Sequence, residues 1–175
     1  IYERNTGTLV YAYNPDLKLA PGALSKIITA LIVIERVEDL DTVVICQPGI
    51  ASRIPGGANN VKLKSEEQLT VRDLLHCMIL QNAADAAVAL AEYIAGTRAT
   101  FVDMMNQRVK QMGCTSTVFT DVHGVGSGAQ YTTARDMIRI MLTATENERM
   151  KTLLATQTYT VAATNMSDAR KFNSQ

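Results

Sequence analysis

Few side chains in this sequence are placed for catalysis by residue type and spacing alone. Lys26 lies near the start of an apolar run, where a lysine acts either as a general base or as a surface residue extending to solvent. His76 and His123 accompany scattered serines, but neither belongs to a recognisable nucleophile motif, and GVGSGA at 124–129 does not fit GxSxG. Its glycines, Gly124, Gly126 and Gly128, lack the flanking strand and lysine of a phosphate loop. We interpret this segment as a plain loop, and His123 as a structural histidine before a turn.

The composition excludes several classes of ligand and partner. The 17 basic residues balance 17 acidic ones, so no global field would recruit nucleic acid or an anionic membrane. Cys46, Cys77 and Cys114 are widely spaced without a CxxC pair, which predicts buried thiols and no metal, disulfide or other cofactor. The uncharged apolar stretch 27–34 is too short to cross a bilayer, so we predict no transmembrane segment in this chain.

The pattern of apolar residues and caps predicts an α+β domain. Strands are expected at 1–4 and 9–13, joined by a turn, and again at 157–163. A buried central helix is expected from Ala23 to about Val37, because its apolar residues leave almost no polar face. Capping residues and glycines predict four further helices, at 70–80, 84–94, 100–113 and 133–143.

Four ordered segments carry a resemblance to a known family. They are NTGTLVYAYNPDLKLAPGALSKIITALIVIE at 5–35, LTVRDLLHCMILQNAADAAVALAEYIAG at 69–96, the stretch 101–113, and FTDVHGVGSGAQYTTARDM at 119–137. Together they resemble the serine-type D-alanyl-D-alanine carboxypeptidases, the low-molecular-mass penicillin-binding proteins. The resemblance implies a β-lactamase/transpeptidase-like fold, with a helical cluster packed on an antiparallel sheet, and an extracytoplasmic location that is secreted or associated with the cell envelope.

Family chemistry rests on a serine three residues before a lysine, an SxN motif and a KTG triplet. Serine and lysine at i and i+3 share one helix face, so the amine can take the hydroxyl proton beside the positive helix N-terminus. By resemblance, the nucleophile position is Ala23 and the general-base position is Lys26. The SxN positions are Asn82 and Ala84, in Asn82-Ala83-Ala84. No KTG, KSG or HTG triplet occurs, and the family would place that strand after Gln175.

Neighbouring residues leave some alternatives open. Ser25 is two residues from Ala23, a rotation of roughly 200° on a helix, so its hydroxyl is expected to face away from that position. Asn82 is either an amide that holds substrate or a helix cap. Asp85 matches a family aspartate after the second motif, and we assign it a structural hydrogen-bonding role.

Three functions are compatible with these residues. The first is a catalytically silent protein that binds peptidoglycan stem peptides or regulates a partner, since a methyl group at position 23 cannot be acylated. The second is a genuine D,D-carboxypeptidase that carries inactivating substitutions here. The third is a structural or assembly module. The resemblance implies one domain over residues 1–175 whose last strands are missing, so a further segment or a second chain is expected to complete the sheet.

Overall fold

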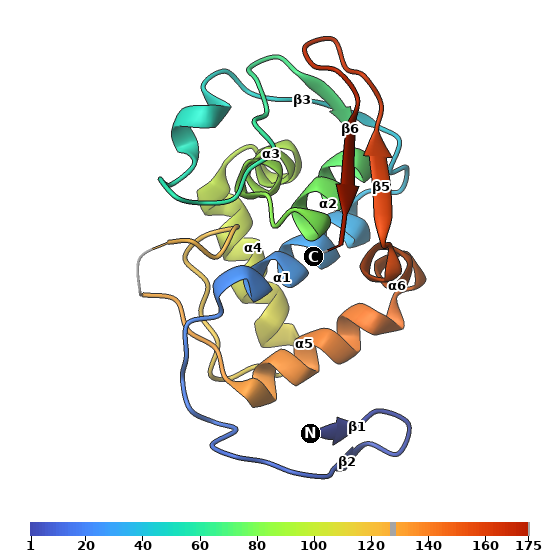
Figure 1. Cartoon of the computed structure of the whole chain (residues 1–175). Helices are drawn as coiled ribbons and strands as arrows, with labels where there is room; N and C mark the ends of the chain where they lie inside the picture. Colours follow the sequence, from blue (N-terminus) through green and yellow to red (C-terminus); the bar gives the residue numbers. More distant parts are fainter. Residues whose placement is uncertain (127–128, 175) are drawn as a thin grey trace.

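Helices form most of the regular structure in the computed structural model, which describes residues 1–126 and 129–174 (Figure 1). The helices are α1 (Ser25–Arg36), α2 (Val71–Leu80), α3 (Ala84–Ala95), α4 (Arg98–Gln111), α5 (Ala134–Glu146) and α6 (Glu148–Ala155), with short 3-10 helices η1 (Gly22–Leu24) and η2 (Ile50–Arg53). The strands are β1 (Tyr2–Glu3), β2 (Thr8–Leu9), β3 (Val43–Ile45), β4 (Gln68–Thr70), β5 (Thr158–Val161) and β6 (Arg170–Asn173). This content confirms the α+β class.

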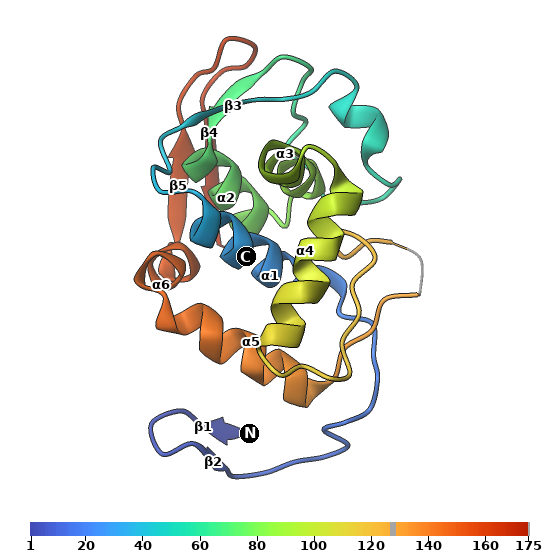
Figure 2. The same ribbon diagram turned by 180° about the vertical axis from the view of Figure 1, so that it is seen from behind.

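Helix α1 is the centre of the core, as its unbroken apolar run predicted. Residues 28–34 are all buried, and α1 packs against α3, α4 and α5. The view from behind shows α1 crossed by α4 on one side, with α5 beneath both (Figure 2). Such a helix gains its stability from burial on every face rather than from a polar surface. The head of α1, where the candidate site lies, therefore has a rigid support.

Side-chain caps determine where several helices begin. Thr70 and Asp73 form the predicted capping box of α2, each side chain bonding the other residue's backbone N–H. Thr133 caps α5 through the N–H of Asp136, again as predicted. The start of α4 was placed too late: Thr97 accepts the N–H of Thr100, so the helix begins at Arg98.

The strands form three separate antiparallel pairs within the described residues, not one continuous sheet. These pairs are β1 with β2, β3 with β4, and β5 with β6. The first two strands are shorter than predicted, while β3, β4, β6 and α6 were not predicted at all. The predicted strand at 157–163 is present as β5, whereas β3, β4 and β6 give too brief an alternation of apolar and polar side chains to be recognised in the sequence.

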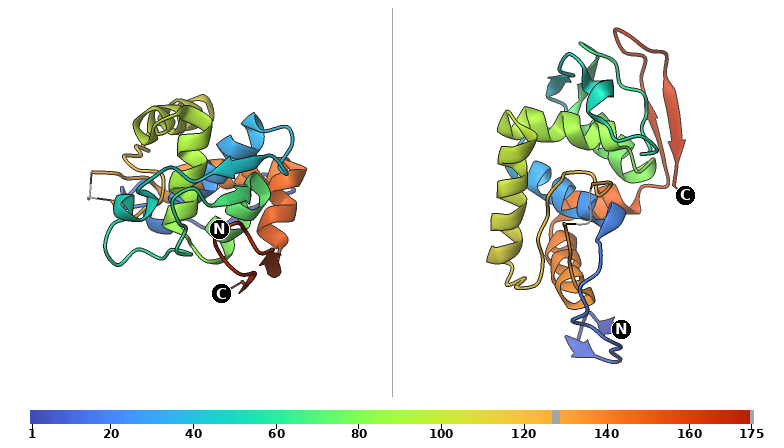
Figure 3. Two further views of the ribbon diagram at one scale, coloured as in Figure 1. Left: turned by 90° about the horizontal axis from the view of Figure 1, so that it is seen from above. Right: turned by 90° about the vertical axis from the view of Figure 1, so that its left-hand side faces the viewer.

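The outer pairs lie at different ends of the molecule. The β5–β6 hairpin runs along α2, whereas the β1–β2 hairpin lies below α5 (Figure 3). The N-terminal hairpin and the segment that follows it leave large apolar side chains exposed, among them Val10, Tyr11 and Tyr13. None of the helices in the described part of the chain has both the length and the apolar character needed to cross a membrane.

Candidate functional site

At the head of α1, an exposed residue is followed one turn later by a buried lysine. Ala23 lies in η1 and is exposed, whereas Lys26, one turn later, is only 2% exposed. The Lys26 amine donates a hydrogen bond to the backbone carbonyl of His123. Burial lowers the pKa of Lys26 to about 8, although the Asp121 carboxylate opposes this shift. The lowered pKa brings Lys26 closer to the range in which a lysine can act as a base near pH 7, although the amine is still mostly protonated at that pH.

Ser25 does not provide a replacement nucleophile at this head. Its side chain is fully buried, while Ala23 is exposed, in agreement with the rotation that separates them on the helix. The Ser25 hydroxyl donates to the carbonyl of Gly22 at 2.8 Å. The Ser25 hydroxyl is therefore hydrogen-bonded to the backbone and buried, so a substrate cannot reach it.

A tight loop organised by Asp121 holds the carbonyl that Lys26 contacts. The Asp121 carboxylate accepts the backbone N–H groups of His123, Gly124 and Gly126 and the amide of Gln130. Burial opposes ionisation, but hydrogen bonds from His123 and the Gly124 N–H lower the pKa of Asp121 to about 2. His123 is buried beside this turn, which supports its structural interpretation; Gly128, assigned to the same loop, lies outside the described residues.

Gly124 is the residue that lets this loop approach α1. Its φ is +82°, and a Cβ built on it would lie 1.8 Å from the carbonyl oxygen of Gly22 and 2.5 Å from the Ser25 hydroxyl. No other residue fits there without moving the backbone, since both the left-handed conformation and the missing side chain are required.

The second motif lies at the junction of α2 and α3. Asn82 is half-buried and adopts a left-handed backbone with φ of 53°, which asparagine tolerates better than most residues. Asn82 does not cap α3, because the N-cap position is Ala83 and no side chain caps the helix. No described residue forms a hydrogen bond with the Asn82 amide. Ala84 is buried, and its N–H donates to the carbonyl of Asn59 at 2.8 Å.

Asp85 has the structural role expected from the sequence. One carboxylate oxygen accepts the N–H of Leu63 at 3.0 Å, and both oxygens lie within 3.1 Å of the N–H of Val61. The carboxylate also accepts the N–H of Ala86 in the first turn of α3. Asp85 therefore fixes the loop before β4 to the helix that follows the second motif.

The structure places Lys26 in a helix that packs against the helix following Asn82. Lys26 belongs to α1 and Asn82 precedes α3, and these helices are in contact. Among the described residues, no hydrogen bond joins Lys26 to Asn82, so this arrangement shows no preformed acid–base pair. Asp121 was not among the residues predicted for the site, although a carboxylate followed by a glycine-rich turn is a recognisable signal for such a loop.

A cleft of about 880 Å³ lies on the α4 side of the same loop. Asp121 and His123 contribute to its wall, as do Arg53, Glu92 and Arg98, but Lys26 does not. Arg53 and Glu92 pair across it at 2.6 Å. The largest of the cavities described here is thus separate from the catalytic motif positions.

Comparison with known proteins identifies relatives along nearly the whole chain. The family model described as D-alanyl-D-alanine carboxypeptidase matches residues 1–174. The carboxypeptidase DacC of Escherichia coli is 35% identical over 139 residues, which are 75% of this chain and 35% of DacC. A D-alanyl-D-alanine carboxypeptidase of Streptomyces is 31% identical over 163 residues, 89% of this chain and 56% of that protein. The chain thus spans about a third to a half of these curated relatives.

Solved structures give the same relationship. The crystal structure of the Streptomyces DD-transpeptidase superposes with a TM-score of 0.89 at 30% identity, covering 98% of this chain and 70% of that one. The carboxypeptidase DacD of Francisella tularensis gives a TM-score of 0.87 at 32% identity, covering 97% of this chain and 41% of that one. The described helices and strand pairs therefore correspond to a part of a larger fold.

Proposed function

Because the chain belongs to the D-alanyl-D-alanine carboxypeptidase family, we propose that it is a catalytically silent member that binds peptidoglycan stem peptides outside the cytoplasm. The observation that carries this proposal is the exposed Ala23 at the head of α1, above the buried Lys26. The covalent route needs a nucleophile at this position, and a methyl group can neither attack a carbonyl nor become acylated. Ser25 offers no substitute, because its hydroxyl is buried and bonded to Gly22.

Binding can persist without catalysis at such a site. The half-buried Asn82 presents an amide that no described residue satisfies, and an amide donates to carbonyls and accepts from N–H groups of a peptide. Positions 82 and 84 both depart from the family pattern in addition to position 23. Several independent losses fit the decay of a reaction better than a single inactivating change.

Two measurements test this proposal on the same protein. A fluorescent penicillin should leave no label that survives a denaturing gel, whereas an active family carboxypeptidase treated in parallel should be labelled. Calorimetric titration should show a peptide ending in D-alanyl-D-alanine bound more tightly than its L,L counterpart. A stable acyl adduct would refute the proposal that the chain is catalytically silent. Equal affinity for the two peptides, or no binding of either, would refute the proposal that it binds peptidoglycan stem peptides.

A genuine D,D-carboxypeptidase with inactivating substitutions is the alternative, favoured by the retained Lys26 and its lowered pKa. Sequencing the native gene distinguishes this alternative from the catalytically silent protein. Serine at position 23 and asparagine at position 84 would establish the alternative, and alanine at both would exclude it. Restoring Ala23→Ser and Ala84→Asn together tests whether the remaining scaffold supports turnover.

The exposed N-terminal hairpin, and the separation of the described strands into three pairs, motivate a second proposal: a further segment or a second chain completes the antiparallel sheet expected from the sequence. Two apolar cavities of about 420 and 390 Å³ lie between this hairpin and α5, lined in part by Tyr2, Ile138 and Leu142. Exposed apolar surface of this kind marks an interaction site. Cooperative unfolding of a soluble monomer of residues 1–175, with no added segment, would contradict this proposal.

A further inference from the structure

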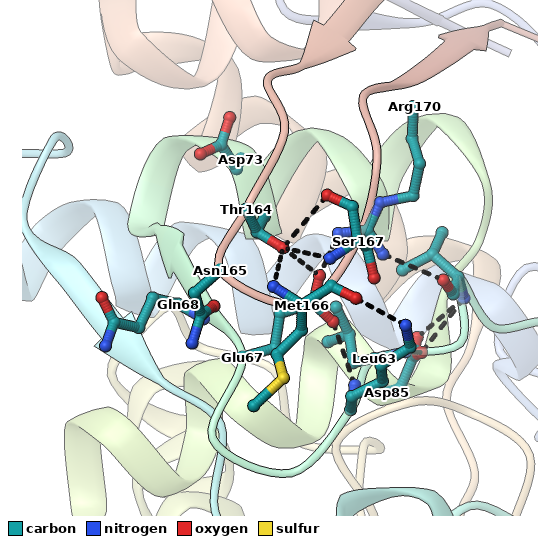
Figure 4. Close-up of polar contacts among 12 residues, drawn as sticks. Leu63, Glu67, Gln68, Asp73, Asp85, Thr164, Asn165, Met166, Ser167 and Arg170 are labelled. Atoms are coloured by element: carbon teal, nitrogen blue, oxygen red, sulfur yellow. Dashed lines mark hydrogen bonds and ion pairs between the residues drawn. The ribbon is translucent and has the colours of Figure 1, made fainter.

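The buried carboxylate of Glu67 lies beneath the β5–β6 hairpin and forms no hydrogen bond with Lys26 among the described residues. Glu67 is 0% exposed, and its oxygens accept the N–H of Lys64 at 3.0 Å and the hydroxyl of Thr164 at 2.9 Å (Figure 4). Arg170 of β6 completes the site with an ion pair at 2.6 Å. A buried carboxylate persists only when charge and hydrogen bonds compensate its desolvation, and here both are provided.

The other arm of Arg170 extends the contact to the loop that precedes β4. One guanidinium nitrogen bonds Glu67, and a second donates to the carbonyl of Val61 at 3.2 Å. The rigid guanidinium therefore fixes β6 to residues 61–67 at two points, which a lysine with one flexible ammonium cannot do in the same way.

The same loop is fastened on its other side to the second motif. Asp85 accepts the N–H groups of Val61 and Leu63, and Ala84 donates to Asn59. Val61 thus bonds Asp85 through its N–H and Arg170 through its carbonyl. A continuous series of hydrogen bonds runs from β6 through this loop to the first turn of α3.

A direct contact joins the hairpin to the other end of the motif. The Gln81 side chain donates to the carbonyl of Asn173 at 3.2 Å. Gln81 immediately precedes Asn82, so residues 82–84 are bordered at one end by this bond and at the other by the bonds of Asp85. The backbone of Asn82 is left-handed between these two attachments.

We infer that Arg170 is a positioning residue that holds the second-motif junction, and with it the Asn82 amide, in the conformation that receives a peptide. This inference rests on the proposed function. A buried ion pair contributes little net stability over apolar residues of similar size, whereas its geometry restricts the groups around it. We therefore expect the Glu67–Arg170 pair to restrict the conformation of the junction more than it raises the stability of the fold.

Hydrogen exchange of Arg170→Met tests the inference without any ligand. Arg170 bonds neither the N–H of Leu63 nor that of Ala84, so a purely local role would accelerate exchange only at Lys64 and along β6. A positioning role predicts at least a tenfold acceleration at Leu63 and Ala84 as well, with the α4 amides unchanged. Arg135→Met is the matched control, because Arg135 pairs with Asp16 on the surface and should alter none of these amides.

If Arg170→Met does not fold because it leaves the buried Glu67 carboxylate unpaired, the double variant Glu67→Gln/Arg170→Met replaces it in the exchange experiment. It leaves no unpaired buried charge and should fold, yet it should show the same acceleration at Leu63 and Ala84. Unchanged exchange at these two amides, in either variant that folds, overturns the inference.

Peptide titration then separates the two proposals. If the unchanged chain binds the D-alanyl-D-alanine peptide, the Arg170 variant should bind at least fivefold more weakly, and equal affinity would contradict the positioning role. If the unchanged chain does not bind while Leu63 and Ala84 still exchange faster in the variant, the stem-peptide proposal fails and the control of the junction by Arg170 stands.

Discussion

Lys26 of α1 donates its hydrogen bond to the main-chain carbonyl of His123, a residue 97 positions later in the sequence. This bond joins the buried head of the central helix to the loop that Asp121 organises. A backbone carbonyl accepts from the amine whether or not the amine is charged. Lys26 can therefore remain bonded through the whole of its titration.

The first prediction concerns the pH dependence that Lys26 imposes on stability. Its pKa falls from 10.5 to about 8 on folding, so between these values the unfolded chain binds more protons than the folded chain. Stability from this group therefore rises with pH across that window, by about 3 kcal/mol at most. Urea unfolding of the unchanged chain and of Lys26→Met should give free energies whose difference shifts in favour of the unchanged chain from pH 8 to pH 10.5. A constant difference would contradict the lowered pKa.

Asp121 should give a pH dependence of the same sign in acid, because its pKa is also lower in the folded chain. Its folded pKa of about 2 lies below the ordinary 3.8, so its contribution is complete above pH 3.8 and is lost as the pH falls toward 2. Asp121→Asn should cost about 2 kcal/mol at pH 7 and should flatten the acid limb of stability. Asp168→Asn, at an exposed carboxylate, is the control and should change neither quantity. An Asp121 variant with unchanged stability at pH 7 would contradict this account of the loop.

Gly124→Ala should be among the most damaging single methyl additions. The new Cβ would overlap the Gly22 carbonyl at 1.8 Å, in addition to the cost of the left-handed backbone. We expect a loss of at least ~2 kcal/mol in the free energy of unfolding, measured by urea denaturation. Gly57→Ala isolates the backbone cost, since Gly57 has φ of +81° and no atom within 4 Å of the added Cβ. Equal losses at the two positions would show that the close approach of Gly124 does not matter.

Tyr159→Phe tests the attachment of β5 to α2. The Tyr159 hydroxyl donates to Asp73 at 2.9 Å, and its ring stacks on His76 with centroids 3.7 Å apart. Removal of the hydroxyl should cost about 1 kcal/mol in thermal or urea unfolding while the stacking remains. Tyr93→Phe, at a side chain that is 42% exposed, should have almost no effect. A similar change in both variants would exclude the Asp73 bond as its source.

Local signals in the sequence were sufficient for much of the helical part of the fold. The apolar run after Ser25 predicted α1, and the pairing of Thr70 with Asp73 predicted the start of α2, because both depend on residues within one or two turns. The strands at the two ends of the chain were predicted, but β3, β4 and β6 were not, since their pairing depends on tertiary contacts rather than on alternation along the chain.

The candidate site was predictable only in part, for the same reason. Motif spacing indicated Lys26, but its burial depends on a loop that approaches from residue 123. The partner of Glu67 lies 103 positions away, and a single glutamate in a polar segment gives no indication of an ion pair. Long-range partners of this kind follow from the three-dimensional arrangement of β6 and the loop before β4.

The left-handed backbone at Asn82 determines what a restored family pattern at the second motif would require of the main chain. Serine occupies that region of conformational space less readily than asparagine, so Asn82→Ser would carry a conformational penalty. Restoring serine at position 23 meets no such obstacle, because Ala23 is exposed and is not among the described residues that have a positive φ. The family residue is therefore expected to cost more conformational free energy at position 82 than at position 23.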